Sequence, residues 1–244
     1  MSGRVSYLGH STTLIELDGA RLLTDPRLRR RVAHLRRATS VPDPGEADAV
    51  LITHGHLDHL DLPSLEHLAR GTPVVVPRGL GRLVRSRGFR SVHEVDEGDE
   101  VAVGEVVVRA THAEHAGRPA PGRPAKTVAY AVEGSARVFF AGDTDLFAGM
   151  AGLVADLDVA LLPIWGWGPS MGPGHLDPVR AAEALTMLRP RLAIPIHWGT
   201  LRPFYRSARA RFLREPVDAF VAAARWHAPG VAVRVLEPGE SLHF

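Results

Sequence analysis

The stretch A-D-A-V-L-I-T-H-G-H-L-D-H, residues 47–59, decides how the rest of the chain is read. It opens with an apolar run, Ala47 to Ile52, which predicts a strand entering the core. Four residues that can bind a metal follow within six positions: His54, His56, Asp58 and His59. A strand end holds its backbone rigidly, and Gly55 allows the next loop to turn tightly. Several side chains can therefore point to one place, and we expect a metal site here.

The composition predicts a globular protein without thiol chemistry. A length of 244 residues allows one large domain over residues 1–244, with a substantial core. The absence of cysteine excludes disulfides, thiolate metal sites and a catalytic Cys. No apolar run approaches the length of a membrane span, and the first residues lack a signal-peptide pattern. We therefore expect a soluble, cytoplasmic protein without a transmembrane segment; the sequence does not predict its oligomeric state.

The charge balance is less basic than the isoelectric point implies. The sequence pI is about 9.5, but the net charge at pH 7 is only +2. Almost nothing titrates between neutral pH and the arginine range, because the chain has one lysine, Lys126, and three tyrosines. The pI therefore overstates the attraction to polyanions, and we do not expect a nucleic acid partner.

The chain alternates short strands and helices, with one long exception. Strands are expected at 4–8, 12–17, 21–24, 47–52, 73–76, 91–95, 101–111 with a break at Gly104, 127–132, 137–141, 158–163, 192–196 and 231–236. Helices are expected after Asp61, over 80–87 and 146–153, after Asp177 and over 216–227. Residues 25–46 predict a long loop with at most one helical turn. Two groups of strands, each followed by helices, predict two packed sheets with helices outside.

Three further residues are candidates to complete the metal site: His115, Asp143 and His197. Each lies in a loop just after a predicted strand. An Asp can bridge two cations that lie roughly 3.5–4 Å apart, because its two oxygens span the pair. A single His in a loop is more often solvated or satisfied in the core, so spacing alone leaves these three undecided.

The ordered motifs resemble the metallo-β-lactamase superfamily. H-G-H-L-D-H at 54–59 is similar to its H-x-H-x-D-H signature. The resemblance continues in order through L-G-H-S-T at 8–12, L-T-D-P at 23–26, A-E-H-A-G-R at 113–118, F-A-G-D-T at 140–144, L-P-I at 162–164, H-L-D-P at 175–178 and I-P-I-H-W-G-T at 194–200. The opening motifs look like the branch of ascorbate-6-phosphate lactonase-like proteins and the N-acylphosphatidylethanolamine-hydrolysing phospholipase D.

The resemblance implies an α/β fold, a four-layer αββα sandwich of two mixed sheets with metals in a cleft at one edge. It assigns a first metal to His54, His56 and His115, a second metal to Asp58, His59 and His197, and Asp143 as the bridge. His112 competes with His115 for the third position, and the A-E-H-A-G-R loop favours His115. The diiron oxygen-reducing members carry Glu where this chain has His56. This difference favours two zinc ions, although Mn²⁺ or Fe²⁺ also fits such ligands.

The ligand set implies hydrolysis. Two cations lower the pKa of a water to around 7, and the resulting hydroxide attacks a carbonyl carbon or a phosphorus. Asp58 and Asp143 would orient this nucleophile, and His175 would protonate the leaving group unless it only precedes a helix. A phosphodiester or phosphorylated ester is the first substrate hypothesis, and a lactone or carboxylic ester is the second; either would be a small or lipid-like molecule. A non-catalytic metal-binding protein is the alternative from another class, and His56 opposes a redox enzyme.

The surroundings of the ligands leave several alternatives open. His10 and Asp25 would hold ligands from behind or line the cleft floor, while ordinary Asp-Pro turn chemistry is the rival for Asp25. Trp165 and Trp167 would wall an apolar substrate pocket, with core packing as the rival. The Arg-rich stretches 27–37 and 202–214 would hold an anion, or would be solvated loops, which is the favoured reading.

Overall fold

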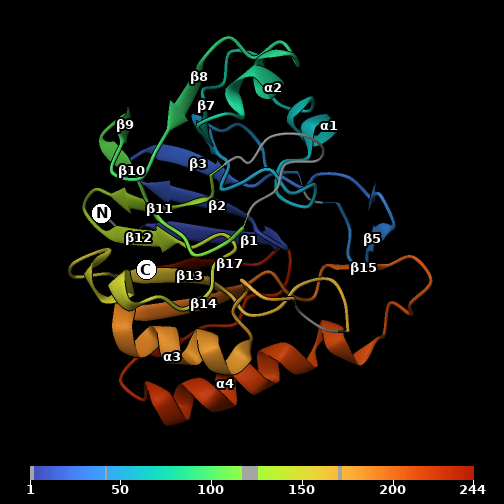
Figure 1. The fold of residues 1–244 in the computed structure, drawn as a ribbon, viewed down its shortest axis with the longest axis vertical. Coiled ribbons are helices and arrows are strands. Elements are labelled where there is room, and N and C mark those ends of the chain that lie inside the picture. The colour runs from blue at the N-terminus through green and yellow to red at the C-terminus, as the bar shows by residue number, and fades with distance from the viewer. Residues whose placement is uncertain (1–2, 42, 117–125, 170–171) are drawn as a thin grey trace.

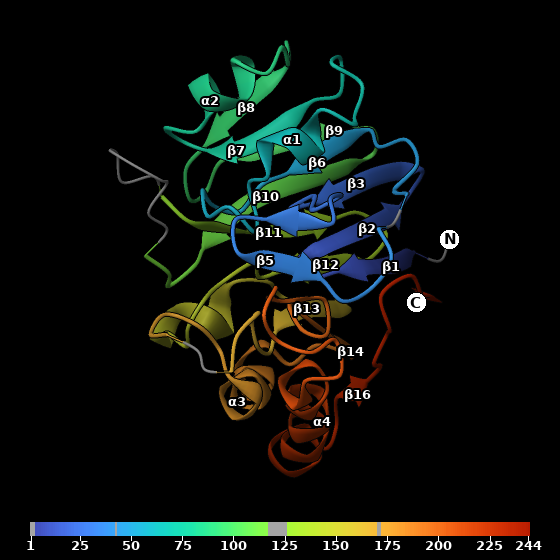
Figure 2. The same cartoon turned by 90° about the vertical axis from the view of Figure 1, so that its right-hand side faces the viewer.

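Two large mixed sheets pack face to face in this computed structural model, which describes residues 3–41, 43–116, 126–169 and 172–244 (Figures 1 and 2). The first sheet has the order β17-β1-β2-β3-β6-β7-β8. Its strands are β1 (Arg4–Gly9), β2 (Thr12–Leu17), β3 (Ala20–Thr24), β6 (Ala49–Leu51), β7 (Val74–Pro77), β8 (Val92–Val95) and β17 (Ser241–His243). Strands β3, β6, β7 and β8 run parallel, and the other pairs are antiparallel.

The second sheet has the order β16-β14-β13-β12-β11-β10-β9. Its strands are β9 (Glu100–Val103), β10 (Val106–His112), β11 (Val128–Glu133), β12 (Arg137–Phe140), β13 (Val159–Pro163), β14 (Leu192–Ile196) and β16 (Ala232–Val233). Strands β12, β13, β14 and β16 are parallel, whereas β9 to β12 form an antiparallel meander. Both sheets are therefore mixed, as expected.

Helices cover the outer faces of the two sheets. The short helices α1 (Leu62–Leu65) and α2 (Gly81–Arg85) lie beside β7 and β8, while α3 (Pro178–Leu188) and α4 (Glu215–His227) lie beside β13 and β14 (Figure 2). The side chain of Asp177 accepts hydrogen bonds from the amides of Val179 and Arg180, both at 2.9 Å, and so caps α3 as predicted. The expected αββα sandwich is confirmed.

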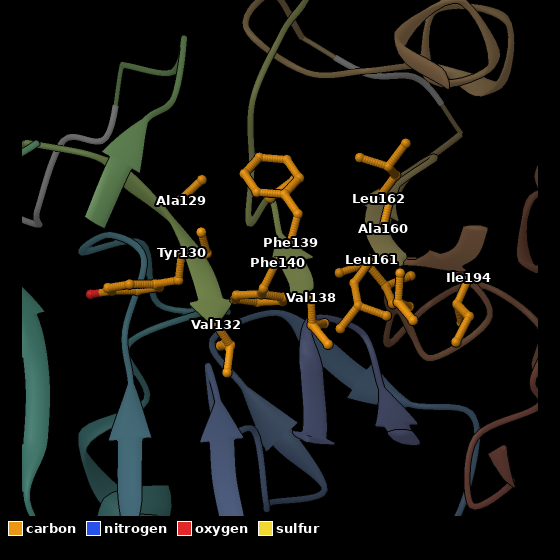
Figure 3. Close-up of a cluster of buried hydrophobic side chains, with 14 of the residues drawn as sticks. Ala129, Tyr130, Val132, Val138, Phe139, Phe140, Ala160, Leu161, Leu162 and Ile194 are labelled. Carbon is orange, nitrogen blue, oxygen red and sulfur yellow. The ribbon is translucent and has the colours of Figure 1, made fainter. Parts of the chain in front are cut away.

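The apolar run before the ligand stretch is buried on both sides. In β6, Ala49 and Leu51 belong to the core between the sheets, whereas Val50 packs toward the outer helices. Figure 3 shows the opposite wall, where Tyr130 and Phe140 lie among the buried side chains of β11 to β13. The Tyr130 hydroxyl donates to the carbonyl of Ile52 at 2.7 Å. This bond ties the second sheet to the backbone just before His54.

A third sheet of three short strands corrects the prediction for residues 25–46. Strands β4 (Arg31–Val32) and β5 (Leu35–Arg37) form a hairpin, and β15 (Leu201–Pro203) pairs with β5. Figure 1 shows β5 and β15 at the side of the sandwich. The prediction of a long loop is wrong here, because Val32 and Leu35 pack on Leu201, which is distant in sequence. Charged residues alternate with the few apolar ones on these strands, so the sequence shows no apolar pattern that would predict them.

Two smaller differences concern helices. The segment expected as a helix over 146–153 is a short 3₁₀ turn, Ala148–Gly152. A second 3₁₀ turn, Arg211–Leu213, precedes α4 within the second Arg-rich stretch. Within the described ranges, no helix combines the length and the apolar character that a bilayer crossing requires.

Candidate metal centre

The candidate ligands all follow strand ends. His54 comes three residues after β6, and His197 directly follows β14. Asp143 comes after β12, and His115 comes after β10. These strands belong to both large sheets, so the centre is built at an edge that the two sheets share. Its side chains collect into two groups, each holding four donor atoms within 4.8 Å of one another.

The first group contains His54, His56, His115 and Asp143. The Nε2 of His54 lies 3.0 Å from the Nδ1 of His56, which in turn lies 3.3 Å from the Nε2 of His115. Two nitrogens that bind one zinc at 2.0–2.1 Å with tetrahedral geometry are ~3.3 Å apart. The spacing of these donor atoms therefore fits a shared metal ion.

The second group contains His10, Asp58, His59 and His197. The Nε2 atoms of His59 and His197 are 3.1 Å apart. The Nε2 of His10 lies 2.9 Å from Oδ2 of Asp58. The sequence placed His10 behind the ligands or on the cleft floor. The structure places it among the donor atoms themselves, and the three other members are those expected for a second metal.

Asp143 lies between the two groups. Its Oδ2 is 3.2 Å from the Nε2 of His59 and 3.8 Å from the Nε2 of His54. Its Oδ1 is 3.3 Å from the Nε2 of His197. One carboxylate thus contacts donors of both groups, which is the position a bridging ligand needs.

Protein partners hold the ligand rings in place from behind. The Nδ1 of His54 contacts Oγ1 of Thr53 at 3.0 Å. The Nδ1 of His115 donates to the carbonyl of Gly174 at 2.7 Å, and that of His197 donates to the carbonyl of Trp165. In each case Nε2 is left pointing into the centre. Such partners fix the tautomer and orientation of metal-binding histidines.

Asp25 organises the second group through His59. Its carboxylate accepts from the Nδ1 of His59 at 2.8 Å and from the amide and hydroxyl of Thr53 at 2.8 and 2.7 Å. It is fully buried and is not a lining residue of the cavity described below. Its carboxylate therefore contacts the His59 ring from behind, which an ordinary Asp-Pro turn does not require.

Three backbone positions at the centre are strained. His10, Asp25 and His197 have φ values of +58°, +33° and +64°, in the left-handed region that residues other than glycine rarely adopt. The amide of His197 donates to the carbonyl of His10 at 2.7 Å, so two of these residues support each other. Strain of this kind persists only where surrounding contacts enforce it, and it concentrates at functional sites.

The electrostatics prepare most of the histidines to bind a cation. Burial, together with neighbouring histidines, lowers the pKa of His54 well below its ordinary value, and burial also lowers the pKa of His115 and His197. These rings are therefore neutral, as metal ligands must be. His59 differs: burial opposes its charge, but Asp143, Asp58 and Asp25 raise its pKa well above the ordinary range. Positive charge is thus strongly stabilised at this point.

The two acidic candidate ligands, Asp58 and Asp143, carry their charge inside the protein. Burial acts to raise the pKa of Asp143, but His197 and His59 hold it well below its ordinary value. His59 and His10 do the same for the pKa of Asp58. Both groups are therefore carboxylates that can bind a cation.

His112 and His175 take different positions. His112 is half-exposed and contacts Glu97 and Glu114 at 3.1 and 3.4 Å, outside both donor groups. The structure therefore favours His115, as the loop motif did. The Nε2 of His175 lies 3.4 Å from Oδ2 of Asp143, and its Nδ1 faces the carbonyls of Gly172 and Pro173.

A cavity of about 350 Å³ opens beside the centre. Its described lining residues are Val32, Ala33, His34, Leu35, His56, Leu57, Asp58, Asp143, Gly166, Trp167, Gly168, Gly172, His175 and His197. Trp167 therefore lines a pocket, as one alternative predicted. Trp165 does not line it; its side chain packs on the core, and its carbonyl orients His197. Sequence reasoning placed an Arg-rich loop beside the cleft but did not identify the hairpin residues 32–35 as an apolar part of its lining.

The buried arginines of the two Arg-rich stretches serve the structure. Arg27 is fully buried and donates to Asp61 at 2.9 Å. Arg37 donates to the carbonyls of Leu8 and Arg27, and Arg202 donates to the carbonyls of its own loop. The favoured reading of solvated loops is therefore wrong for these three side chains.

Comparison with known proteins gives the family. Residues 20–198 match the family described as the beta-lactamase superfamily domain. The chain belongs to the metallo-β-lactamase superfamily. A UPF0173 metal-dependent hydrolase of Methanopyrus kandleri is 33% identical over 98% of both chains. Another from Opitutus terrae is 34% identical, over 98% of this chain and 99% of the relative. The expected class, a metal-dependent hydrolase of this superfamily, is confirmed at this level.

Solved structures share the superfamily fold. Igni18, a metallo hydrolase of Ignicoccus hospitalis, has a TM-score of 0.73 and 24% identity, covering 100% of this chain and 99% of that one. CmlA, a diiron β-hydroxylase of Streptomyces venezuelae, also has a TM-score of 0.73, with 21% identity over 99% of this chain and 54% of its own. At these identities the likeness shows the fold alone, because one fold hosts many reactions.

Proposed function

We propose that this member of the metallo-β-lactamase superfamily is a binuclear metal-dependent hydrolase of ester bonds. One observation carries the proposal: two groups of four donor atoms are adjacent, and the carboxylate of Asp143, a member of the first group, also contacts His59 and His197 of the second. A non-catalytic metal-binding protein would need neither the shared carboxylate nor a cavity open to it. Relatives named metal-dependent hydrolases support the same class.

The first metal ion would be held by His54, His56 and His115, and the second by Asp58, His59 and His197, with Asp143 between them. His10 offers a further donor to the second position. Imidazole and carboxylate ligands suit zinc, and Mn²⁺ or Fe²⁺ is compatible with the same set. When bound, such ions supply Lewis acidity and make a water acidic enough to act as a nucleophile near neutral pH.

The side chains of this chain have separate parts in the reaction. The carboxylates of Asp58 and Asp143 orient the attacking water, and one of the two accepts its proton. His175 lines the cavity, with its Nε2 3.4 Å from Asp143, and is placed to give a proton to the departing oxygen. Carboxylates and imidazoles are the groups that commonly perform such transfers.

The cavity changes the order of the two substrate hypotheses. Both fit the opening motifs, which resemble lactonase-like proteins and a phospholipase D. Among the described lining residues there is no lysine or arginine, and Arg27 and Arg37 of the first Arg-rich stretch are buried against Asp61 and carbonyl groups. A carboxylic ester or lactone therefore fits this site better than a phosphorylated ester.

Metal content and one substitution test the proposal. Purified protein should contain close to two metal ions per chain by elemental analysis. Asp143→Ala should lower that content and abolish hydrolysis of p-nitrophenyl butyrate while the circular dichroism stays native. Asp218→Ala, an exposed position on α4, is the matched control. A native Asp143→Ala protein that keeps both metals and full activity would refute the shared-carboxylate assignment.

A further inference from the structure

The cavity beside the metal centre has two unlike walls. One wall is the centre itself, with His56, Asp58, Asp143, His175 and His197. The other wall comes from the hairpin of β4 and β5, residues 32–35, together with Leu57 and Trp167. The reacting bond of a substrate must face the first wall, so the second wall contacts the rest of the substrate.

The second wall is apolar. Val32 and Leu35 form a small hydrophobic cluster with Leu201, and Trp167 packs against it. Leu57 is 52% exposed and also lines the cavity. An exposed large apolar side chain in a concave site is a usual mark of ligand contact. His34 is the one described polar side chain on the hairpin part of this wall, and its ring meets the Trp167 ring edge-on with centroids 5.0 Å apart.

Charge is confined to the metal-centre side. Among the described lining residues, Asp58 and Asp143 are the acidic ones, and neither arginine nor lysine is present. An anionic substituent placed against the second wall would lose its hydration without gaining a partner, which is strongly unfavourable. The wall therefore selects against substrates that carry charge away from the scissile bond.

The second wall is held in place before any substrate binds. The backbone amide of Phe204 donates to the carbonyl of His34 at 2.9 Å, and β5 pairs with β15. The buried Arg37 ties the end of the hairpin to the carbonyls of Leu8 and Arg27 at 2.6 and 2.9 Å. A pocket fixed in this way binds a matching group with little ordering cost.

We propose that the hairpin 32–35 and Trp167 form a specificity pocket for an uncharged, apolar acyl group, so that the preferred substrates are small neutral carboxylic esters or lactones. This inference rests on the proposed hydrolase function and deepens it. The cavity volume of about 350 Å³ equals the liquid volume of about a dozen water molecules, so the pocket accepts a short chain or one ring.

The test compares four chromogenic substrates on the metal-loaded full-length protein. They are p-nitrophenyl acetate, p-nitrophenyl butyrate, bis-p-nitrophenyl phosphate and p-nitrophenyl phosphate. Two extra buried methylene groups should raise kcat/KM about tenfold from acetate to butyrate. The doubly charged p-nitrophenyl phosphate should be the poorest of the four.

Two variants locate the preference, and a third is the control. Trp167→Ala should reduce the butyrate-to-acetate ratio to near one, with the acetate rate within about threefold of the parent protein. His34→Lys should raise kcat/KM for p-nitrophenyl phosphate and lower it for butyrate, and it carries the test if Trp167→Ala does not fold, because the His34 backbone bond to Phe204 does not involve the side chain. Trp226→Ala removes an 83% exposed tryptophan on α4 and should change nothing.

The outcomes separate the two levels of the proposal. No metal-dependent hydrolysis of any of the four compounds would overturn the proposed function itself. Hydrolysis that is fastest with p-nitrophenyl phosphate, or that shows no chain-length preference, would overturn the specificity pocket alone. A butyrate preference that survives both Trp167→Ala and His34→Lys would also overturn it, since the apolar group would then bind elsewhere. Loss of the preference in these variants, with Trp226→Ala unchanged, supports the pocket.

Discussion

Replacing Asp25 with Asn should weaken one of the two proposed metal positions more than the other. The Asp25 carboxylate accepts three hydrogen bonds, two from Thr53 and one from the Nδ1 of His59. An amide keeps the size of the side chain but turns one acceptor into a donor. In Asp25→Asn, one of the three donors must therefore face another donor or turn away. Losing the partner of a metal-binding histidine typically costs 10–100-fold in metal affinity.

The effect should be larger at the second donor group. Asp25 contacts His59 directly, whereas it reaches His54 only through the Thr53 hydroxyl, and the His115 ring is oriented by the Gly174 carbonyl. Competition with a chromophoric chelator should resolve two zinc affinities in the parent protein. In Asp25→Asn, we expect one of the two binding free energies to fall by about 1.4–2.7 kcal/mol, the equivalent of that 10–100-fold loss, and the other to fall by less.

The control for this measurement is Asp18→Asn, which removes an exposed carboxylate that also accepts two hydrogen bonds, both from Ser135. Thermal unfolding without metal should show whether Asp25→Asn has a folding defect, because a buried unpaired donor costs about 1–3 kcal/mol. Unchanged affinities at both positions would refute the role of Asp25 in orienting His59. An equal loss at both positions, with normal unfolding, would refute the separation into two groups.

Two further predictions concern stability. Asp61→Ala should lower the free energy of unfolding by about 3–5 kcal/mol, because the fully buried Arg27 would lose its partner at 2.9 Å; calorimetry should show a fall in Tm of roughly 6–20 °C. Burial raises the pKa of Tyr7, whose hydroxyl donates to the carbonyl of Trp198, to about 12. The unfolded chain loses this proton near pH 10, so the stabilisation is fully present below that pH, and about 2–3 kcal/mol is lost as the pH rises through 12. Urea titrations at pH 9 to 12 measure how far the free energy of unfolding falls with pH. This fall should be smaller in Tyr7→Phe than in the parent protein. Tyr205→Phe, at an exposed tyrosine, is the control and should show the same fall as the parent.

The two large sheets could be predicted because most of their strands have a recognisable local sequence pattern. Strand β6 is an apolar run that is buried on both faces, and such a run can be identified without knowing which strands pair with it. The dense ligand cluster of residues 54–59 is equally local. Sequence spacing alone did not decide whether His115, Asp143 and His197 belong to the metal site. The family resemblance assigned them to it, and the structure brings their donor atoms to the same centre.

The third sheet and the contribution of its hairpin to the cavity could not be predicted, for a physical reason. Each strand of the hairpin is two or three residues long, which is too short for a recognisable alternation. The hairpin is stabilised by pairing with β15, which lies far away in the sequence, and by the buried Arg37, which donates hydrogen bonds to backbone carbonyl groups. An arginine in a charged run is usually solvated, and nothing local shows that this one is not.

The position of His10 shows how far the centre depends on the whole sandwich. His10 follows β1 of the first sheet, and His197 follows β14 of the second. Their ring centroids are nevertheless 3.8 Å apart, and their backbones share a hydrogen bond. Both residues have left-handed backbone conformations that only such mutual contacts can maintain. The second donor group therefore exists only when the two sheets are docked. Metal binding at this group should stabilise the docked sheets by mass action, because the undocked chain cannot present the same four donor atoms together.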